Sequence, residues 1–201
     1  MIKKTNLTKI LIFIISTCCF VLNSQVIPDT EDTMLRTSAA PQPGWFNDNG
    51  SCDCSSDTQW GFNGDPFIGG AYPPPTGHSY FMTCGSWDGG ESAMGTITGL
   101  TIGEQYAFTF YVAGFRMDNI RFGDNIGDSY NITVGDESSG DVNFTSVGWI
   151  SQTFTFTADA TSEPIIVRTT SNSSFRTTHY SFTSSSVTVA CFSGNAGPSF
   201  F

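Results

Sequence analysis

Strict alternation of apolar and polar residues is the feature that most limits how this 201-residue chain can fold. In QYAFTFYVA, residues 105–113, every second side chain is large and apolar, and WISQTFTFTA, residues 149–158, follows a similar rule. A period of two is typical of a β-strand that buries one face. Trp149, which begins the second segment, is interpreted as a core residue. The alternating positions of these segments and of residues 129–134 and 185–191 predict the rest of the core: Tyr106, Phe108, Phe110, Val112, Ile132, Val134, Phe154, Phe156, Val187 and Val189.

Shorter strands follow the same logic, and turns rich in Gly, Asn and Asp separate them. Residues 47–78 have the composition of a long loop. Many short strands predict an all-β fold, an antiparallel β-sandwich (jelly roll), over residues 44–191. Residues 25–43 are polar and acidic and are predicted to form a flexible leader, with residues 192–201 as a C-terminal tail. The additional strands are expected at 79–83, 93–98, 129–134, 141–145, 164–170 and 185–191.

Residues 1–24 predict export. A basic start precedes an apolar run from Ile10 to Phe20 and then small polar residues, the pattern of a secretory signal peptide cleaved after Ser24. The apolar run is shorter than the ~20 residues that a membrane-spanning helix needs. We therefore expect a secreted or cell-surface bacterial protein that is not inserted in the membrane once the signal peptide is removed.

The charge balance excludes two classes of partner. All three lysines lie in the signal peptide, so the exported part carries five arginines against 18 acidic residues, a net charge of −13. Such a surface repels the phosphates of nucleic acids and anionic lipid headgroups. The exported part also has only two leucines, while Thr, Ser, Gly and Phe abound, which disfavours helical folds.

Four cysteines remain after removal of the signal peptide, and export favours disulfides. We expect Cys84 to pair with Cys52 or Cys54, which ties the irregular segment to the strands. A zinc site is the alternative, but Cys-x-Cys lacks the Cys-x2-Cys spacing that is common in zinc sites.

Acidic turns suggest a structural calcium ion. Asp118, Asp124 and Asp128 fall in one Gly- and Asn-rich stretch, and calcium prefers carboxylate and carbonyl oxygens. The alternative is that these residues only form turns.

Two passages resemble a known fold family. GTITGLTIGEQYAFTFYVAG, residues 95–114, is similar to the strand, Gly-Leu turn and Gly-x-x-Tyr element of galactose-binding-like jelly rolls, which include the carbohydrate-binding modules of secreted xylanases and glucanases. WISQTFTFTADATSEPIIVRTTSNSS, residues 149–174, resembles the same family's Trp and Phe-Thr-Ala passage. The resemblance implies a β-sandwich that binds a carbohydrate.

A sugar ring has an apolar face and a polar rim, so its site is expected to combine aromatic faces with hydrogen-bonding side chains. Two tryptophans fall in loops, and one tyrosine lies on the non-core face of the central strand between Ala107 and Ala113. The net charge favours a neutral glycan over a polyanion. The predicted sugar-contacting residues are Trp60, Trp87, Tyr111 and Arg116.

The sequence predicts no catalytic centre. It contains neither G-x-S-x-G nor H-E-x-x-H, and its two histidines, His78 and His179, lie among small polar residues. The main interpretation is an exported, non-catalytic carbohydrate-binding module. The alternatives are a structural or adhesive cell-surface module that binds other surface proteins, and a small secreted hydrolase.

Overall fold

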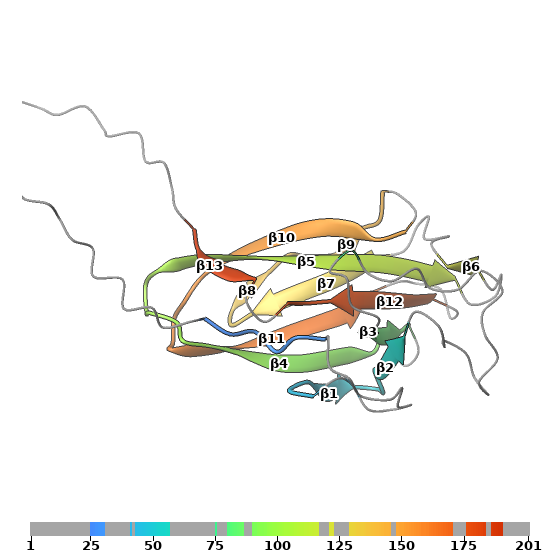
Figure 1. The fold of residues 1–201 in the computed structure, drawn as a ribbon, viewed down its shortest axis with the longest axis horizontal. Helices are drawn as coiled ribbons and strands as arrows, with labels where there is room; N and C mark the ends of the chain where they lie inside the picture. The colour runs from blue at the N-terminus through green and yellow to red at the C-terminus, as the bar shows by residue number, and fades with distance from the viewer. Residues whose placement is uncertain are drawn as a thin grey trace, which may run out of the picture.

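Every regular element in the described part of the chain is a β-strand, and all paired strands are antiparallel (Figure 1). Among these residues there is no helix long and apolar enough to cross a membrane. The computed structural model describes residues 25–30, 41, 43–56, 75, 80–86, 90–116, 121–122, 129–145, 148–170, 176–183 and 186–190.

The strands form two sheets that enclose one core, so the predicted all-β antiparallel sandwich is confirmed. Sheet A has the order β1-β4-β11-β7-β8, and β9 also pairs with β7. Sheet B has the order β10-β5-β12-β3-β2, and both β13 and β6 also pair with β5. The strands of sheet A are β1 (Phe46–Asn49), β4 (Ser92–Thr98), β7 (Ser129–Val134), β8 (Glu137–Ser138), β9 (Val142–Asn143) and β11 (Ser162–Thr169). Those of sheet B are β2 (Asp53–Ser56), β3 (Tyr80–Gly85), β5 (Gln105–Arg116), β6 (Arg121–Phe122), β10 (Ile150–Thr157), β12 (Arg176–Ser181) and β13 (Val187–Val189).

Aromatic side chains fill the space between the sheets. The ring of Phe108 on β5 lies 5.6 Å from that of Phe154 on β10 and 6.1 Å from that of Phe182. Phe110 stacks on Phe182 with ring centroids 5.3 Å apart. Phe154 stands directly opposite Phe108 in the sheet, so the alternating residues of both strands point to the same side. Nine of the ten side chains predicted from the alternation are buried.

Val189 is the exception, and this part of the core prediction is wrong. It pairs with Tyr106 and so shares the inner side of sheet B, yet 40% of its surface is exposed. β13 is three residues long and pairs with β5 alone among the described strands. Val189 therefore lies at an open corner of the sandwich, where alternation no longer ensures burial.

Residues 25–30 fall in the predicted leader, yet they pack against both sheets. Val26 exchanges two backbone hydrogen bonds with Thr98 at the end of β4, and Ile27 is fully buried. The N–H of Thr30 donates to the carbonyl of Phe182, whose own N–H donates to Thr30 Oγ1. Burial of the Ile27 side chain, which stabilises a fold by ~1.5–3 kcal/mol, accounts for the docking of this polar segment.

One disulfide joins Cys52 to Cys84, with Cα atoms 4.4 Å apart. It is one of the two pairings that the sequence left open. The carboxylate of Glu91 accepts hydrogen bonds from the backbone N–H groups of Gly85 and Ser51, the residues next to the two bonded cysteines. Both ends of the disulfide are thus also held by a buried side chain.

Candidate functional site

One of the four predicted sugar-contacting side chains lies in the part of the chain that the structure describes. Tyr111 is half-buried in β5 and lies on the outer side of sheet B, because its neighbours Phe110 and Val112 belong to the core. Arg116 ends β5, but its side chain is outside the described residues, as are Trp60 and Trp87. The role of these three residues in sugar binding stays a prediction.

The predicted calcium ligands Asp118, Asp124 and Asp128 also fall outside the described residues. Within the described ranges, no group of three or more His, Cys, Asp or Glu side chains is placed to hold a metal ion. Calcium binding therefore stays a prediction as well.

His179 is poorly placed for catalysis. Its side chain is 1% exposed, and its Nδ1 lies 2.7 Å from Oγ1 of Thr83. Burial lowers the pKa of His179 to about 3, so the ring is neutral at neutral pH. A general base must reach the substrate and take up a proton near the working pH, and this histidine does neither.

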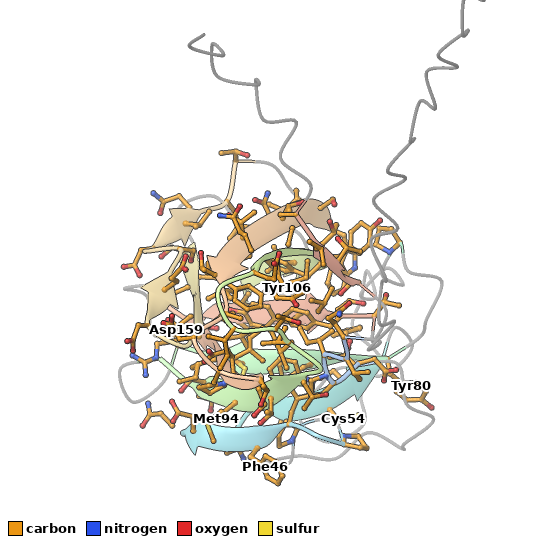
Figure 2. The ribbon with its side chains drawn as sticks, turned by 90° about the vertical axis from the view of Figure 1, so that its left-hand side faces the viewer. Phe46, Cys54, Tyr80, Met94, Tyr106 and Asp159 are labelled. Atoms are coloured by element: carbon orange, nitrogen blue, oxygen red, sulfur yellow. A yellow bond between two sulfur atoms is a disulfide. The ribbon has the colours of Figure 1, made fainter. Side chains whose placement is uncertain are left out.

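The outer face of sheet A carries a row of apolar side chains that crosses three neighbouring strands. Phe46 of β1 stands opposite Met94 of β4, and Met94 stands opposite Ile166 of β11. Phe46 is 65% exposed and Met94 36%, whereas Ile166 is half-buried. Figure 2 places Phe46 and Met94 on the outside of the molecule and Tyr106 in its interior. We call Phe46, Met94 and Ile166 the apolar strip.

A polar row runs beside the apolar strip. Arg168 of β11 stands opposite Ser92 of β4 on one side and Asn131 of β7 on the other. The Arg168 guanidinium lies 3.7 Å from the carboxylate of Asp48, which accepts a 2.8 Å hydrogen bond from Ser92 Oγ. The ion pair is partly exposed, so the guanidinium is screened by water yet accessible to a ligand.

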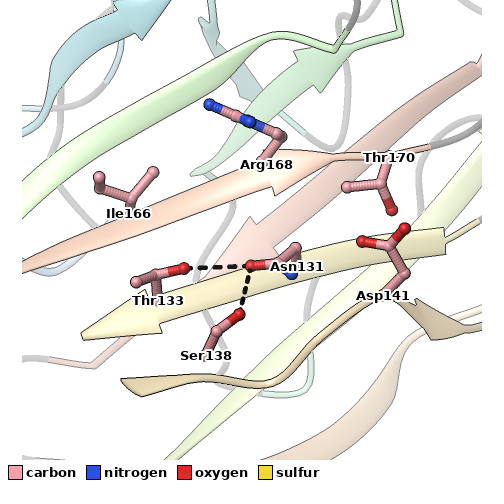
Figure 3. Close-up of a pocket in the computed structure, with 7 residues that line it drawn as sticks. All are labelled: Asn131, Thr133, Ser138, Asp141, Ile166, Arg168 and Thr170. Carbon is pink, nitrogen blue, oxygen red and sulfur yellow. Dashed lines mark hydrogen bonds between the residues drawn. The ribbon is translucent and has the colours of Figure 1, made fainter. Parts of the chain in front are cut away.

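The strip and the polar row end in a pocket of about 290 Å³ on the β7 side of sheet A (Figure 3). The hydroxyls of Thr133 and Ser138 each donate to Asn131 Oδ1 over 3.2 Å and so orient the amide, whose NH₂ group can donate to a ligand. Asp141 supplies a carboxylate on the same wall. The pocket is lined by Asn131, Thr133, Ser138, Asp141, Ile166, Arg168 and Thr170.

This arrangement suits a polyhydroxylated ligand. Ligand pockets usually measure ~300–1,000 Å³, so this one accommodates a small group such as a single sugar ring. Asn131 and Arg168 offer donors, Asp141 offers an acceptor, and Ile166 offers an apolar surface. From β7 to β1 the face spans three strand spacings, about 14 Å, long enough for a short oligosaccharide to continue along the apolar strip.

Sequence reasoning missed this face, although a signal for it was present. In SAMGTIT, residues 92–98, Ala93 and Ile97 point into the core, whereas Met94 is a large apolar residue at an outward position. Ile166 is likewise out of phase between Ile165 and Val167. A contiguous group of outward apolar residues is typical of an interaction surface, but only the register shows that these two lie side by side.

Trp149 lies outside the core, so its interpretation as a core residue is wrong. It precedes β10 and is half-buried. Its ring packs edge-on against Phe81, with centroids 5.4 Å apart, and lies tilted to the ring of His179 at 6.3 Å. Phe81 and His179 alternate with core residues of β3 and β12 and therefore lie on the outer side of sheet B, which places Trp149 there too.

No protein-family model and no curated protein sequence matches this chain. Solved structures do match it. An arabinose-bound GH51 α-L-arabinofuranosidase aligns over 82% of this chain with a TM-score of 0.50 and 9% identity, and this chain covers 26% of that enzyme. A family 16 carbohydrate-binding module aligns over 73% of this chain and 91% of its own length, with a TM-score of 0.45 and 11% identity. The K2 cleaved adhesin domain of Lys-gingipain aligns over 80% of this chain and 96% of its own, with a TM-score of 0.45 and 12% identity. At such identities the likeness is one of fold.

Proposed function

We propose that this chain is an extracellular, non-catalytic carbohydrate-binding module that binds a neutral glycan on the outer face of sheet A. The observation that carries the proposal is the exposed apolar strip leading into a small polar pocket. The apolar face of a sugar ring matches the strip, and its hydroxyls match the donors and acceptors of Asn131, Arg168 and Asp141. The disulfide supports a place outside the cytosol, where thiols become oxidised.

Charge supports a neutral ligand over an anionic one. The single cation beside the pocket, among the described residues that line it, is Arg168, and it already faces Asp48. Asp141 adds a second carboxylate, and the exported part has an excess of 13 negative charges. A uronate-rich glycan is therefore repelled, and this repulsion weakens as salt shortens its range.

The proposal is tested by calorimetric titration of neutral hexasaccharides derived from xylan, cellulose and galactan. Binding of at least one of them is expected, with modest affinity, because an open face recovers little beyond the cost of immobilising a flexible chain. Phe46→Ala is expected to weaken that binding about tenfold, which corresponds to ~1.4 kcal/mol, because it removes the most exposed ring of the strip.

Ile102→Ala is the matched control. Ile102 is 64% exposed, almost as much as Phe46, but it lies in the turn between β4 and β5. This variant is expected to bind like the unchanged protein. If no hexasaccharide binds at millimolar concentration, the proposal is wrong and the adhesive alternative takes its place. Release of shorter sugars during the titration would instead favour the hydrolase.

A further inference from the structure

Strand β10 forms one edge of sheet B, with no strand on its free side among the described residues. It pairs with β5 over its whole length, and Figure 1 draws it along the upper margin of the sandwich. The pair Thr157–Gln105 shows how its backbone is turned. Thr157 donates its N–H to Glu137 Oε1 over 2.7 Å, and the Gln105 carbonyl accepts from the N–H of Ala190, next to β13. The two residues therefore turn their backbone groups away from each other.

Every second residue of an antiparallel strand turns its backbone N–H and C=O to the same side. Thr155, Thr153 and Ser151 share the direction of Thr157, so their N–H and C=O groups point to the free side of β10. Within the described ranges, no residue donates to or accepts from the backbone of these three on that side. This part of the edge is open to another strand.

The other edges among the described strands carry features that hinder strand addition. Natural edge strands are commonly short, bulged or charged, which prevents pairing with another chain. β1 is four residues long, with a register shift between Asn47 and Asn49 and a charge at Asp48. β2 is also four residues long and begins at Asp53, and β8 and β9 have two residues each. β10 has eight residues, ISQTFTFT, with an uninterrupted register to β5 and no charge, proline or glycine.

The inner side of β10 is also less covered than the rest of the core. Phe154 is 9% exposed, the largest exposed fraction among the apolar core residues, and Ile150 and Gln152 are half-buried. A strand added at this edge covers them. It needs the alternation of β10 itself, with large side chains inward and hydroxylated side chains outward, and a second copy of β10 has that alternation.

We propose that two copies of this chain pair through β10 in antiparallel orientation and form a dimer with one continuous sheet B. A two-fold axis places the same strand on both sides of the contact. The three open residues are symmetric about Thr153, so Thr153 stands opposite Thr153 of the second copy, and Ser151 stands opposite Thr155. Each of these three pairs exchanges two hydrogen bonds, about six in all. In this register Gln152 lies beside Phe154 of the second copy.

The contact is uncharged, although the whole chain is acidic. No residue of β10 carries a charge, so strand pairing brings no like charges together within it. The excess of 13 negative charges on each exported part still repels the two copies at long range, and salt shortens that range. Dimerisation is therefore expected to strengthen as salt is added. Pairing uses both β10 edges, so assembly stops at the dimer.

Sedimentation velocity of the unchanged protein tests the inference, from micromolar to millimolar concentration and at low and high salt. The monomer is expected to become a dimer as the concentration rises, and to do so at lower concentration in high salt. Thr153→Pro is expected to abolish the dimer, because proline removes the central N–H yet is tolerated in an edge strand whose N–H faces solvent. Thr153→Lys keeps the N–H and is expected to weaken the dimer several-fold, because it places two like charges opposite each other.

Thr109→Lys is the matched control. Thr109 stands opposite Thr153 on the same exposed face, but it lies on β5, one strand away from the free edge. The variant makes the same change of charge and is expected to dimerise like the unchanged protein. Equal weakening by Thr153→Lys and Thr109→Lys would show that the contact lies elsewhere and would overturn the inference.

Amide hydrogen exchange at low and high protein concentration locates the contact. The amides of Ser151, Thr153 and Thr155 are expected to become protected as the dimer forms, whereas that of Phe154, which faces β5, is protected throughout. A monomer under all conditions, a dimer in which the three amides stay unprotected, or assembly beyond the dimer overturns the inference. The edge belongs to neither outer face, so absence of glycan binding would overturn the proposed function and leave the dimer standing.

Discussion

His179 shows how a single side chain makes the stability of this protein depend on pH. It is buried against Phe81 and Trp149 with Thr83 as its hydrogen-bonding partner, and burial lowers its pKa to about 3. An unfolded chain takes up a proton at this residue below the ordinary pKa of ~6.5, whereas the folded chain does not until about 3. Between these values the unfolded state binds more protons, so stability falls as the pH falls.

The stability of the unchanged protein is therefore expected to decrease by up to ~1.4 kcal/mol per pH unit on acidification below 6.5 because of His179. Urea unfolding at pH 6.5, 5.5 and 4.5 measures this, with His179→Gln as the comparison, since glutamine keeps a polar side chain without the titration. The variant is expected to be less sensitive to acid. Parallel pH profiles for the two proteins would show that His179 does not supply the effect.

Glu91 changes the stability with pH in the opposite direction to His179, and it is present in both proteins of that comparison. Burial raises its pKa despite the hydrogen bonds that it accepts from Gly85 and Ser51. The folded state then favours the protonated carboxyl, and the stability that this contributes is present below the ordinary glutamate pKa of 4.5 and lost as the pH rises through the folded pKa. The His179→Gln comparison cancels this contribution.

At the scale of elements, the Cys52–Cys84 disulfide stabilises chiefly by restricting the unfolded chain. It closes a separation of 32 residues, which is worth roughly 3–4 kcal/mol in the chain-entropy description. In the folded state Glu91 holds the same two ends, so the native geometry does not depend on the covalent bond alone.

Replacing both bonded cysteines, in Cys52→Ser/Cys84→Ser, is expected to lower the free energy of unfolding by roughly 3–4 kcal/mol. Denaturant unfolding under non-reducing conditions gives the difference, and the unchanged protein in reductant is the control, expected to lose a similar amount. A loss below 1 kcal/mol in both would mean that the unfolded chain is already restricted in this region.

Alternation predicted the elements wherever one face of a strand is apolar and the other is not. β5 and β10 follow it, and their register places Phe108 opposite Phe154 as an inward pair. β12 was not predicted because it is buried on both faces, so its sequence does not alternate. His179 and Tyr180 are adjacent, and both are inaccessible to solvent. β2 was not predicted because it is only four residues long and lies in a segment with the composition of a loop. Its pairing with β3 holds it in place.

At the scale of the whole molecule, the fold was predictable from the sequence but the proposed site on sheet A was not. Phe46, Met94 and Ile166 come from segments far apart in the chain, and only the pairing of β1, β4 and β11 brings them into one row. Met94 and Ile166 each break the alternation locally, but a single break has many explanations. The outward position of Tyr111 was predictable because it alternates with core residues on one strand, whereas its role in sugar binding stays a prediction.

Both outer faces thus depart from the usual solvated surface of a sandwich, and they depart in different ways. Sheet A combines exposed apolar side chains with an ion pair and a pocket. The outer side of sheet B carries Tyr111, Trp149 and the hydroxylated side chains of β5 and β10. Sugar binding on sheet A is the central claim, because that face has both the pocket and, among the described residues, the most exposed aromatic ring.

The most direct test of that claim is an NMR titration that follows the methyl groups of Met94 and Ile166 as the tightest-binding neutral hexasaccharide is added. Both methyl groups lie in the apolar strip, whereas the exposed Ile102 and the buried Ile97 lie elsewhere and act as internal references. The account predicts that the Met94 and Ile166 signals shift progressively to saturation while those of Ile102 and Ile97 stay in place. Saturable binding of the hexasaccharide that leaves the Met94 and Ile166 signals unmoved would contradict it.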